Sequence, residues 1–104
     1  MPWVGTYILD ENHNPVPEPD TLKWAAWFED VENRIVEQDI IDGVQISTVF
    51  LGLDHGPNDQ GPPVLWETMI FGGSHHEYQC RYTSHEEALC GHAAAVRLVT
   101  SDRN

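Results

Sequence analysis

Residues 44–71 constrain the fold more than any other part of the chain. They read VQISTVFLGLDHGPNDQGPPVLWETMIF, which is two apolar runs on either side of a polar segment rich in Gly and Pro. Each run shows the two-residue alternation that is typical of a β-strand. We therefore predict strands over 44–53 and 64–71, joined by a loop over 55–63.

Two further strands adjoin this pair in the sequence. Residues 34–41 alternate in the same way, and Asp42 and Gly43 then supply the two positive-φ positions of a type I′ hairpin turn. Residues 72–76 (GGSHH) are a second turn, and residues 77–82 are a fourth alternating segment. Because sequential strands usually pair with one another, we predict an antiparallel four-stranded meander.

A helix is predicted on each side of these strands. Asp20 can accept hydrogen bonds from the first amides of a helix over 20–33. The apolar residues of this helix share one face, predicted to lie on the core or alternatively to form a patch for a partner: Trp24, Trp27, Phe28 and Val31. Ser84 and Glu87 form a capping box for a second helix that runs to about residue 100. Its predicted core stripe is Leu89, Ala93 and Val96.

The first 19 residues are predicted to hold little regular structure. Residues 3–9 suit a short edge strand, and residues 10–19 (DENHNPVPEP) form a loop whose three prolines lack backbone donors. We therefore predict one domain over 1–104, in which this N-terminal strand and Pro-rich loop precede a helix–sheet–helix body over 20–104. The predicted fold class is α+β, a two-layer sandwich with an N-terminal and a C-terminal helix flanking the sheet.

The chain is strongly acidic. Its 17 Asp and Glu residues outnumber its five Lys and Arg residues, and the formal net charge is −12. Nucleic acid and anionic membranes are therefore not expected as direct partners, because clustered cations bind both. Two interpretations remain, a solvated surface that limits association and a surface that docks on a basic partner. The candidate acidic surface comprises Glu18, Asp20, Glu29, Asp30, Glu32, Glu37 and Asp39.

Cysteine usage and hydropathy bear on the compartment. Cys80 and Cys90 do not make a disulfide framework. The first residues show no basic leader with a long apolar region, and no apolar run approaches the roughly 18 residues of a membrane span. We therefore predict a cytoplasmic protein with both thiols reduced.

Asp54 and His55 are the candidate binding site that the strand pattern indicates. They leave a strand for a loop, which is where functional side chains gather on a rigid scaffold. The carboxylate can orient the imidazole as a general base or metal ligand, and Glu67 can face the pair across the sheet. Trp66 and Tyr82 are the predicted aromatic walls of this pocket. The alternative is structural, with Asp54 closing an Asx turn while His55 faces water.

No metal site and no cofactor are predicted. A zinc site would draw on side chains whose spacing matches no compact zinc finger: Cys80, Cys90 and His92 with His75, His76 or His85. His92 lies beside the predicted apolar stripe, which favours a hydrogen-bonded core histidine. The chain has no G-x-S-x-G elbow and no P-loop lysine, so no catalytic residue is predicted.

Four segments resemble a known family. They are PVPEPDTLKWAAWFE, ISTVFLGLDH, PPVLWETMIFGG and RYTSHEEALCGHAAAV, and together they span roughly residues 15–97. They resemble a family of short acidic proteins encoded in bacteriophages and prophages. This resemblance implies a phage or prophage gene that acts in the cytoplasm of an infected bacterium. The family has no settled activity, so the resemblance implies no catalytic role.

These features together predict a non-enzymatic accessory protein that acts by binding. Its expected partner is a host or phage protein with a basic surface, for example a host-defence or nucleic-acid-binding protein that it inhibits. One alternative is a small-molecule binder or small enzyme with its site at the Asp54–His55 loop. The other is a structural or regulatory homodimer that pairs through exposed strand edges.

Overall fold

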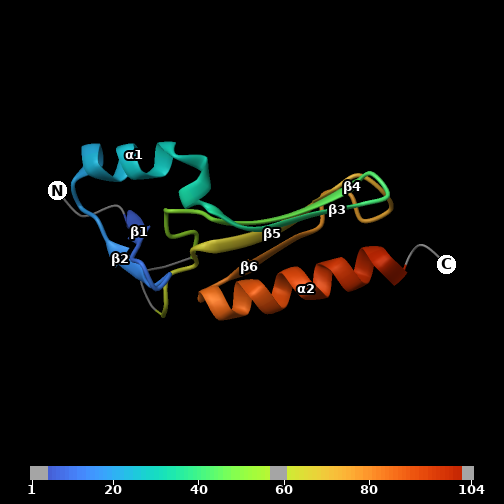
Figure 1. Ribbon diagram of the computed structural model, residues 1–104. Coiled ribbons are helices and arrows are strands. Elements are labelled where there is room, and N and C mark those ends of the chain that lie inside the picture. The colour runs from blue at the N-terminus through green and yellow to red at the C-terminus, as the bar shows by residue number, and fades with distance from the viewer. Residues whose placement is uncertain (1–4, 57–60, 102–104) are drawn as a thin grey trace.

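The computed structural model, which describes residues 5–56 and 61–101, consists of a four-stranded antiparallel sheet packed against a long helix, with a small hairpin and a second helix at one end (Figure 1). The strands of the main sheet lie in the order β3 (Ile35–Ile41), β4 (Val44–Phe50), β5 (Trp66–Phe71) and β6 (Gln79–Tyr82). Helix α2 (His85–Ser101) covers one face of this sheet. The predicted α+β fold with an antiparallel meander is confirmed.

The turns of the meander follow the local sequence. Asp42 and Gly43 have φ angles of 50° and 80°, as a type I′ turn requires, and Ile41 pairs directly with Val44. Strands β4 and β5 are shorter than predicted, because the paired ladder ends where Phe50 lies opposite Trp66. The loop predicted over 55–63 lies partly outside the described residues.

Helix α2 begins with the predicted capping box. The Ser84 hydroxyl accepts from the Glu87 amide at 3.1 Å, while the Glu87 carboxylate reaches back to the amide and hydroxyl of Thr83. These hydrogen bonds hold the pKa of Glu87 below its usual range. The cap satisfies first-turn donors and fixes where the helix starts.

The stripe that α2 buries differs from the prediction. Its buried residues are Ala88, His92, Ala95 and Val99, whereas Leu89 is 40% exposed. These four residues follow one another at intervals of three or four and so share one helix face. The predicted stripe is therefore wrong at Leu89 and Ala93, which are exposed, whereas Val96 is half-buried and packs against the core. The predicted positions lie about one residue too far along the helix. The prediction considered only apolar residues, whereas a histidine, His92, occupies the middle of the buried face.

Helix α1 (Thr21–Glu29) is shorter than the predicted helix over 20–33. Asp20 caps it as expected by accepting from the amides of Leu22 and Lys23. Asp30 then adopts an extended conformation and caps a separate 3₁₀ turn, η1 (Val31–Asn33). This break removes Val31 from the apolar face and leaves it 52% exposed.

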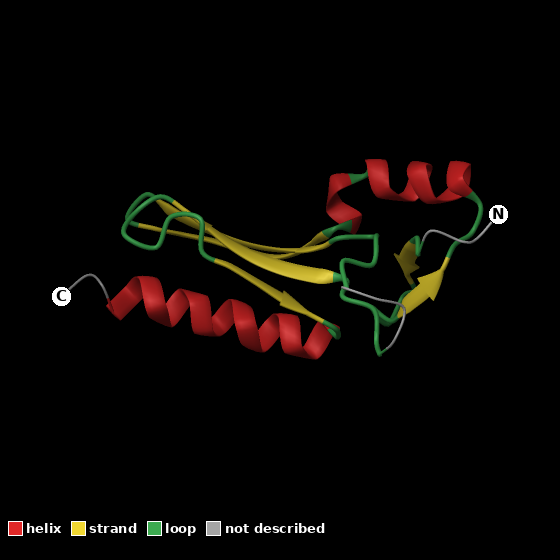
Figure 2. Ribbon diagram, turned by 180° about the vertical axis from the view of Figure 1, so that it is seen from behind, coloured by secondary structure: helices red, strands yellow, loops and turns green. Residues whose placement is uncertain are grey.

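The aromatic residues of α1 pack at one end of the main sheet. Trp27 meets the ring of Phe50 edge-on at 5.7 Å. Trp24 stacks on Phe28 and donates from Nε1 to the carbonyl of Gly52 at 3.1 Å. The helix lies beside the N-terminal hairpin, and the two views show that it does not cover the face of the sheet (Figures 1 and 2).

That hairpin pairs β1 (Tyr7–Leu9) with β2 (Pro15–Pro17). The prediction of a loop over 10–19 is therefore wrong for the three residues of β2. Proline is tolerated here because each strand of a two-stranded sheet has one side that needs no ladder partner. Residues 3 and 4 of the predicted edge strand lie outside the described residues.

Helix α2 is 17 residues long. Crossing the hydrocarbon core of a bilayer takes about 20 consecutive apolar residues. Within residues 5–56 and 61–101, no helix has both the length and the apolar character for this.

Candidate functional site

A polar layer divides the core between the sheet and α2. The cluster on one side is Ile46, Ile70, Ala95 and Val99. The cluster on the other side is Phe50, Leu65, Trp66 and Ala88. Between them Thr48, Thr68 and His92 are all 0% exposed. Buried polar groups destabilise a fold unless they are hydrogen-bonded, so a layer of this kind needs partners for each of its atoms.

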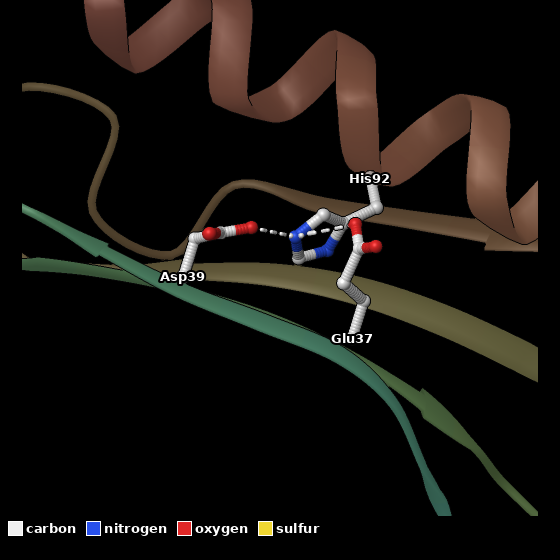
Figure 3. Close-up of side chains that lie close together, drawn as sticks. All are labelled: Glu37, Asp39 and His92. Atoms are coloured by element: carbon white, nitrogen blue, oxygen red, sulfur yellow. Dashed lines mark hydrogen bonds and ion pairs between the residues drawn. The ribbon is translucent and has the colours of Figure 1, made fainter.

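The polar side chains form a continuous series of hydrogen bonds. The hydroxyl oxygens of Thr68 and Thr48 lie 2.5 Å apart, and that of Thr48 lies 2.7 Å from Nδ1 of His92. On the far side of the ring, Nε2 lies 2.8 Å from Oδ2 of Asp39 and 3.3 Å from Oε2 of Glu37 (Figure 3). The imidazole therefore connects the buried threonines to two carboxylates.

The two carboxylates come from β3, one of the two edge strands of the sheet. Glu37 pairs with Thr48 and Asp39 with Ile46, so both side chains lie on the α2 side of the sheet. They are 48% and 47% exposed, whereas the side chain of His92 is 1% exposed. One nitrogen of the ring is thus held in a dry interior, and the other points to a solvated edge.

The partners of His92 constrain its proton positions. An ionised carboxylate only accepts hydrogen bonds, so the Nε2 that faces Asp39 is the donor. A hydroxyl can donate or accept, and Thr48 therefore suits an Nδ1 with or without a proton. The predicted assignment of His92 as a hydrogen-bonded core histidine is confirmed.

The arrangement suits coordination or ion pairing better than nucleophilic chemistry. Thr48 is the hydroxyl that contacts the imidazole, and at 0% exposure it cannot meet a substrate. Glu37, Asp39 and His92 instead offer three ligand atoms that all lie within 4.8 Å of one another. Among residues 5–56 and 61–101, this is the one such group of His, Cys, Asp and Glu side chains.

The structure gives the predicted Asp54–His55 site a different role. Oδ1 of Asp54 accepts from the amides of Gly56 and Val64 at 2.8 and 2.9 Å. Nδ1 of His55 lies 2.7 Å from the carbonyl oxygen of Leu53. Both side chains therefore bind nearby backbone and stabilise the strand exit, as the structural alternative of an Asx-type turn predicts.

The other residues predicted for that site serve the sheet. The carboxylate of Glu67 accepts from Gln79 at 2.5 Å and from Arg81 at 2.9 Å, and among the described residues no hydrogen bond joins it to Asp54 or His55. Trp66 is 0% exposed within the core. Tyr82 lies under α2, where its ring fills the space that a Cβ on Gly91 would occupy. Burial raises the pKa of Tyr82 to about 12.

The candidate acidic surface separates into two parts. Glu18 and Asp20 lie at the start of α1, where Glu18 accepts from the amide of Asp20. The other five residues lie along one path, from the end of α1 through η1 and along β3 (Figure 1). We call these five residues the acidic band: Glu29, Asp30, Glu32, Glu37 and Asp39. All five are exposed.

Two histidines, His13 and His85, lie where the N-terminal hairpin approaches the start of α2. The rings of His13 and His85 are stacked, with their centroids 4.5 Å apart. Burial, and then the charge of His13, lowers the pKa of His85. Glu32 lines the same small cavity as this pair.

The chain matches no protein-family model, and no curated protein or solved structure is significantly similar to it. No relative therefore assigns a role to the polar layer or to the acidic band. Their own chemistry has to indicate what they do.

Proposed function

We propose that this protein is a non-enzymatic binding protein that engages a basic surface of a partner protein through the acidic band. The observation that carries this proposal is the lack of lysine or arginine ion pairs along the band. In the part of the chain that the structure describes, none of its five carboxylates pairs with a lysine or arginine.

The arginines of the described chain that adjoin this region have other partners. The guanidinium of Arg34 lies 4.4 Å from the centre of the Phe28 ring, and Arg81 pairs with Glu67. The single positive charge of Arg34 offsets part of the band's potential, but no arginine forms an ion pair with its five carboxylates among the described residues, so the band keeps a net negative charge. Such a surface accelerates encounter with a positively charged partner and sets the register of docking.

The position of the band on an edge strand indicates how a partner would bind. Charged side chains on an edge strand oppose pairing with another strand. Two members of the band, Glu37 and Asp39, lie on β3 itself. The partner is therefore expected to bind the side chains of the band rather than to extend the sheet.

The resemblance to phage and prophage proteins supports a partner in the cytoplasm of an infected bacterium. A host-defence or nucleic-acid-binding protein has the basic surface that this proposal requires. Such a protein would be inhibited if the band occupied the surface where it binds nucleic acid. The excess of acidic residues argues against direct binding of nucleic acid by this chain.

The test compares two variants of equal net charge. Glu29→Gln/Glu32→Gln neutralises part of the band, whereas Glu77→Gln/Glu86→Gln neutralises two exposed carboxylates elsewhere. None of these four carboxylates accepts a hydrogen bond from another described residue, so neither variant should disturb the fold. Immobilised wild-type protein is expected to retain a basic protein from bacterial lysate at low salt and to release it at high salt.

The captured protein is then purified and its affinity for each variant is measured. The band variant should bind about fivefold more weakly, since each exposed charge contributes about 0.5 kcal/mol, and the control should bind like wild type. Equal weakening of both variants would show a nonspecific effect of net charge and would contradict the proposal. Light scattering of the purified chain tests the homodimer alternative at the same time.

A further inference from the structure

Glu37, Asp39 and His92 have the donor types and spacing of a metal site. We infer that these three side chains bind one divalent transition-metal ion of the zinc type at the edge of the sheet. The donors would be Nε2 of the histidine and one oxygen from each carboxylate (Figure 3).

The distances between the donors fit this inference. Zinc lies about 2.1 Å from nitrogen and carboxylate oxygen ligands, so two donors at 90° are about 3.0 Å apart and two at a tetrahedral angle about 3.4 Å apart. The observed Nε2 to oxygen distances are 2.8 Å to Asp39 and 3.3 Å to Glu37. All three donor atoms lie within 4.8 Å of one another, and rotation of the two half-exposed carboxylate side chains would adjust their spacing to one ion.

The orientation of the imidazole is the second supporting observation. A histidine that ligates a metal through one nitrogen typically donates from the other to a fixed acceptor. Here Nδ1 faces the hydroxyl of Thr48, which is itself bonded to Thr68, and all three side chains are wholly buried. When the ion takes Nε2, the proton moves to Nδ1 and Thr48 becomes the acceptor, while the Thr48 hydroxyl donates to Thr68.

The three proposed ligands differ in burial, since the histidine is buried and both carboxylates are half-exposed. The ring is held in the core, where it has one orientation, and the carboxylates lie at the solvated edge. An ion can therefore enter from solvent without opening the fold. Three protein ligands leave at least one coordination position for water or for an oxygen or nitrogen atom of a ligand.

The ligand set indicates which ion is preferred. One imidazole with two carboxylates suits zinc and neighbouring transition metals, whereas magnesium and calcium favour sites made entirely of oxygen. The two carboxylates also balance the charge of a divalent cation. This inference goes beyond the proposed partner binding, since it requires the histidine and no second protein.

The experiment is calorimetric titration of chelator-treated protein with Zn²⁺ alone. Wild type is expected to bind one ion, and millimolar Mg²⁺ should not compete. Asp39→Asn and Glu37→Gln should each weaken binding by about tenfold or more, because each replaces a charged ligand by a neutral amide. The amide oxygen at position 39 can still accept from Nε2, so the fold is expected to persist.

Two controls separate this site from other binding. Glu29→Gln/Glu32→Gln removes neighbouring charges of the band but no proposed ligand, and its zinc affinity should stay within about twofold of wild type. His75→Gln/His76→Gln removes the adjacent pair of turn histidines and should also leave the affinity unchanged. Because the first control is the variant that tests partner binding, failure of either proposal is distinguishable from failure of the other.

Nuclear magnetic resonance of the histidine rings gives an independent readout. Zinc should shift Nε2 of His92 to a metal-bound position and place the ring proton on Nδ1. A purely structural His92 would show neither change. The inference is overturned if wild type and Asp39→Asn bind zinc equally, if wild type binds none at millimolar zinc, or if only His75 and His76 respond.

Discussion

Two histidine–carboxylate pairs in this chain have opposite settings. Asp54 and His55 are adjacent in the sequence, exposed, and bound to backbone atoms of their own loop. Asp39 and His92 are 53 residues apart, and their side chains join the edge of the sheet to a buried face of α2. Only the second pair draws groups from different elements into one place.

The difference shows what sequence adjacency means for such pairs. Neighbouring polar residues at a strand exit have unsatisfied backbone groups within reach, and an Asx-type turn is the local way to satisfy them. A pair assembled by the fold has no such local use. It places polar groups where apolar ones would pack at lower energetic cost, which is why it is the stronger candidate for function.

The largest expected effect is a loss of stability that distinguishes His92 from His55. His92→Ala removes a wholly buried ring and one of the two hydrogen-bond partners of the Thr48 hydroxyl, so we expect the free energy of unfolding to fall by about 3–5 kcal/mol. His55→Ala removes an exposed ring and should change it by less than about 0.5 kcal/mol. Urea unfolding of both variants measures the difference, and comparable losses would mean that burial does not distinguish the pairs.

Thr48→Val tests the polar layer with almost no change in volume. It removes the hydroxyl that faces both Nδ1 of His92 and Thr68, and we expect a loss of about 1–3 kcal/mol in unfolding free energy. Thr100→Val makes the same exchange at an exposed position of α2 and should be nearly neutral. If the variant at position 48 proves as stable as wild type, the polar layer does not depend on this hydroxyl.

Much of the fold could be predicted because its signals are local. The hairpin turn at Asp42 and Gly43 depends on two residues that tolerate positive φ, and the start of α2 depends on the capping box of Ser84 and Glu87. The alternation over 44–50 predicts a strand, and β4 spans these residues. Each of these patterns is complete within a few residues of the chain.

The polar layer could not be predicted because its signal is tertiary. Strand alternation alone places Glu37 and Asp39 on one side of β3, but it does not tell which residue of α2 lies opposite them. That register depends on how the helix is seated, for example on the ring of Tyr82 against Gly91. Treating His92 as an apolar position would have recovered the true stripe, since Ala88, Ala95 and Val99 lie at helical spacing from it.

A smaller loss of stability is expected at the exposed pair of Asp54 and His55. Asp54→Ala removes the acceptor of two backbone amides, and we expect the unfolding free energy to fall by about 1 kcal/mol. Zinc affinity should stay at the wild-type value, in contrast to Asp39→Asn. Calorimetry and urea unfolding of the same preparation check both results. Weaker zinc binding by Asp54→Ala would indicate that the metal binds at Asp54 and His55 rather than at Asp39 and His92.

The smallest expected effect is on the pH dependence of stability and involves the stacked pair of His13 and His85. His85 is half-buried, whereas His55 is exposed and His92 is buried. Burial and the charge of His13 place the pKa of His85 below its value of 6.5 in the unfolded chain. Between the two pKa values the unfolded state binds more protons than the folded state, so this group contributes stability above pH 6.5 that is lost as the pH falls. Glu32 is the carboxylate that lines the same cavity.

We therefore expect the urea midpoint of wild type to fall between pH 7 and pH 5 more steeply than that of His85→Gln. Below this range, stability is lost by a different route, since Glu87 and Asp10 have pKa values held below 4.5 and 3.8 by hydrogen bonds. If His85→Gln has the wild-type slope, the stacked pair does not oppose protonation in the folded state.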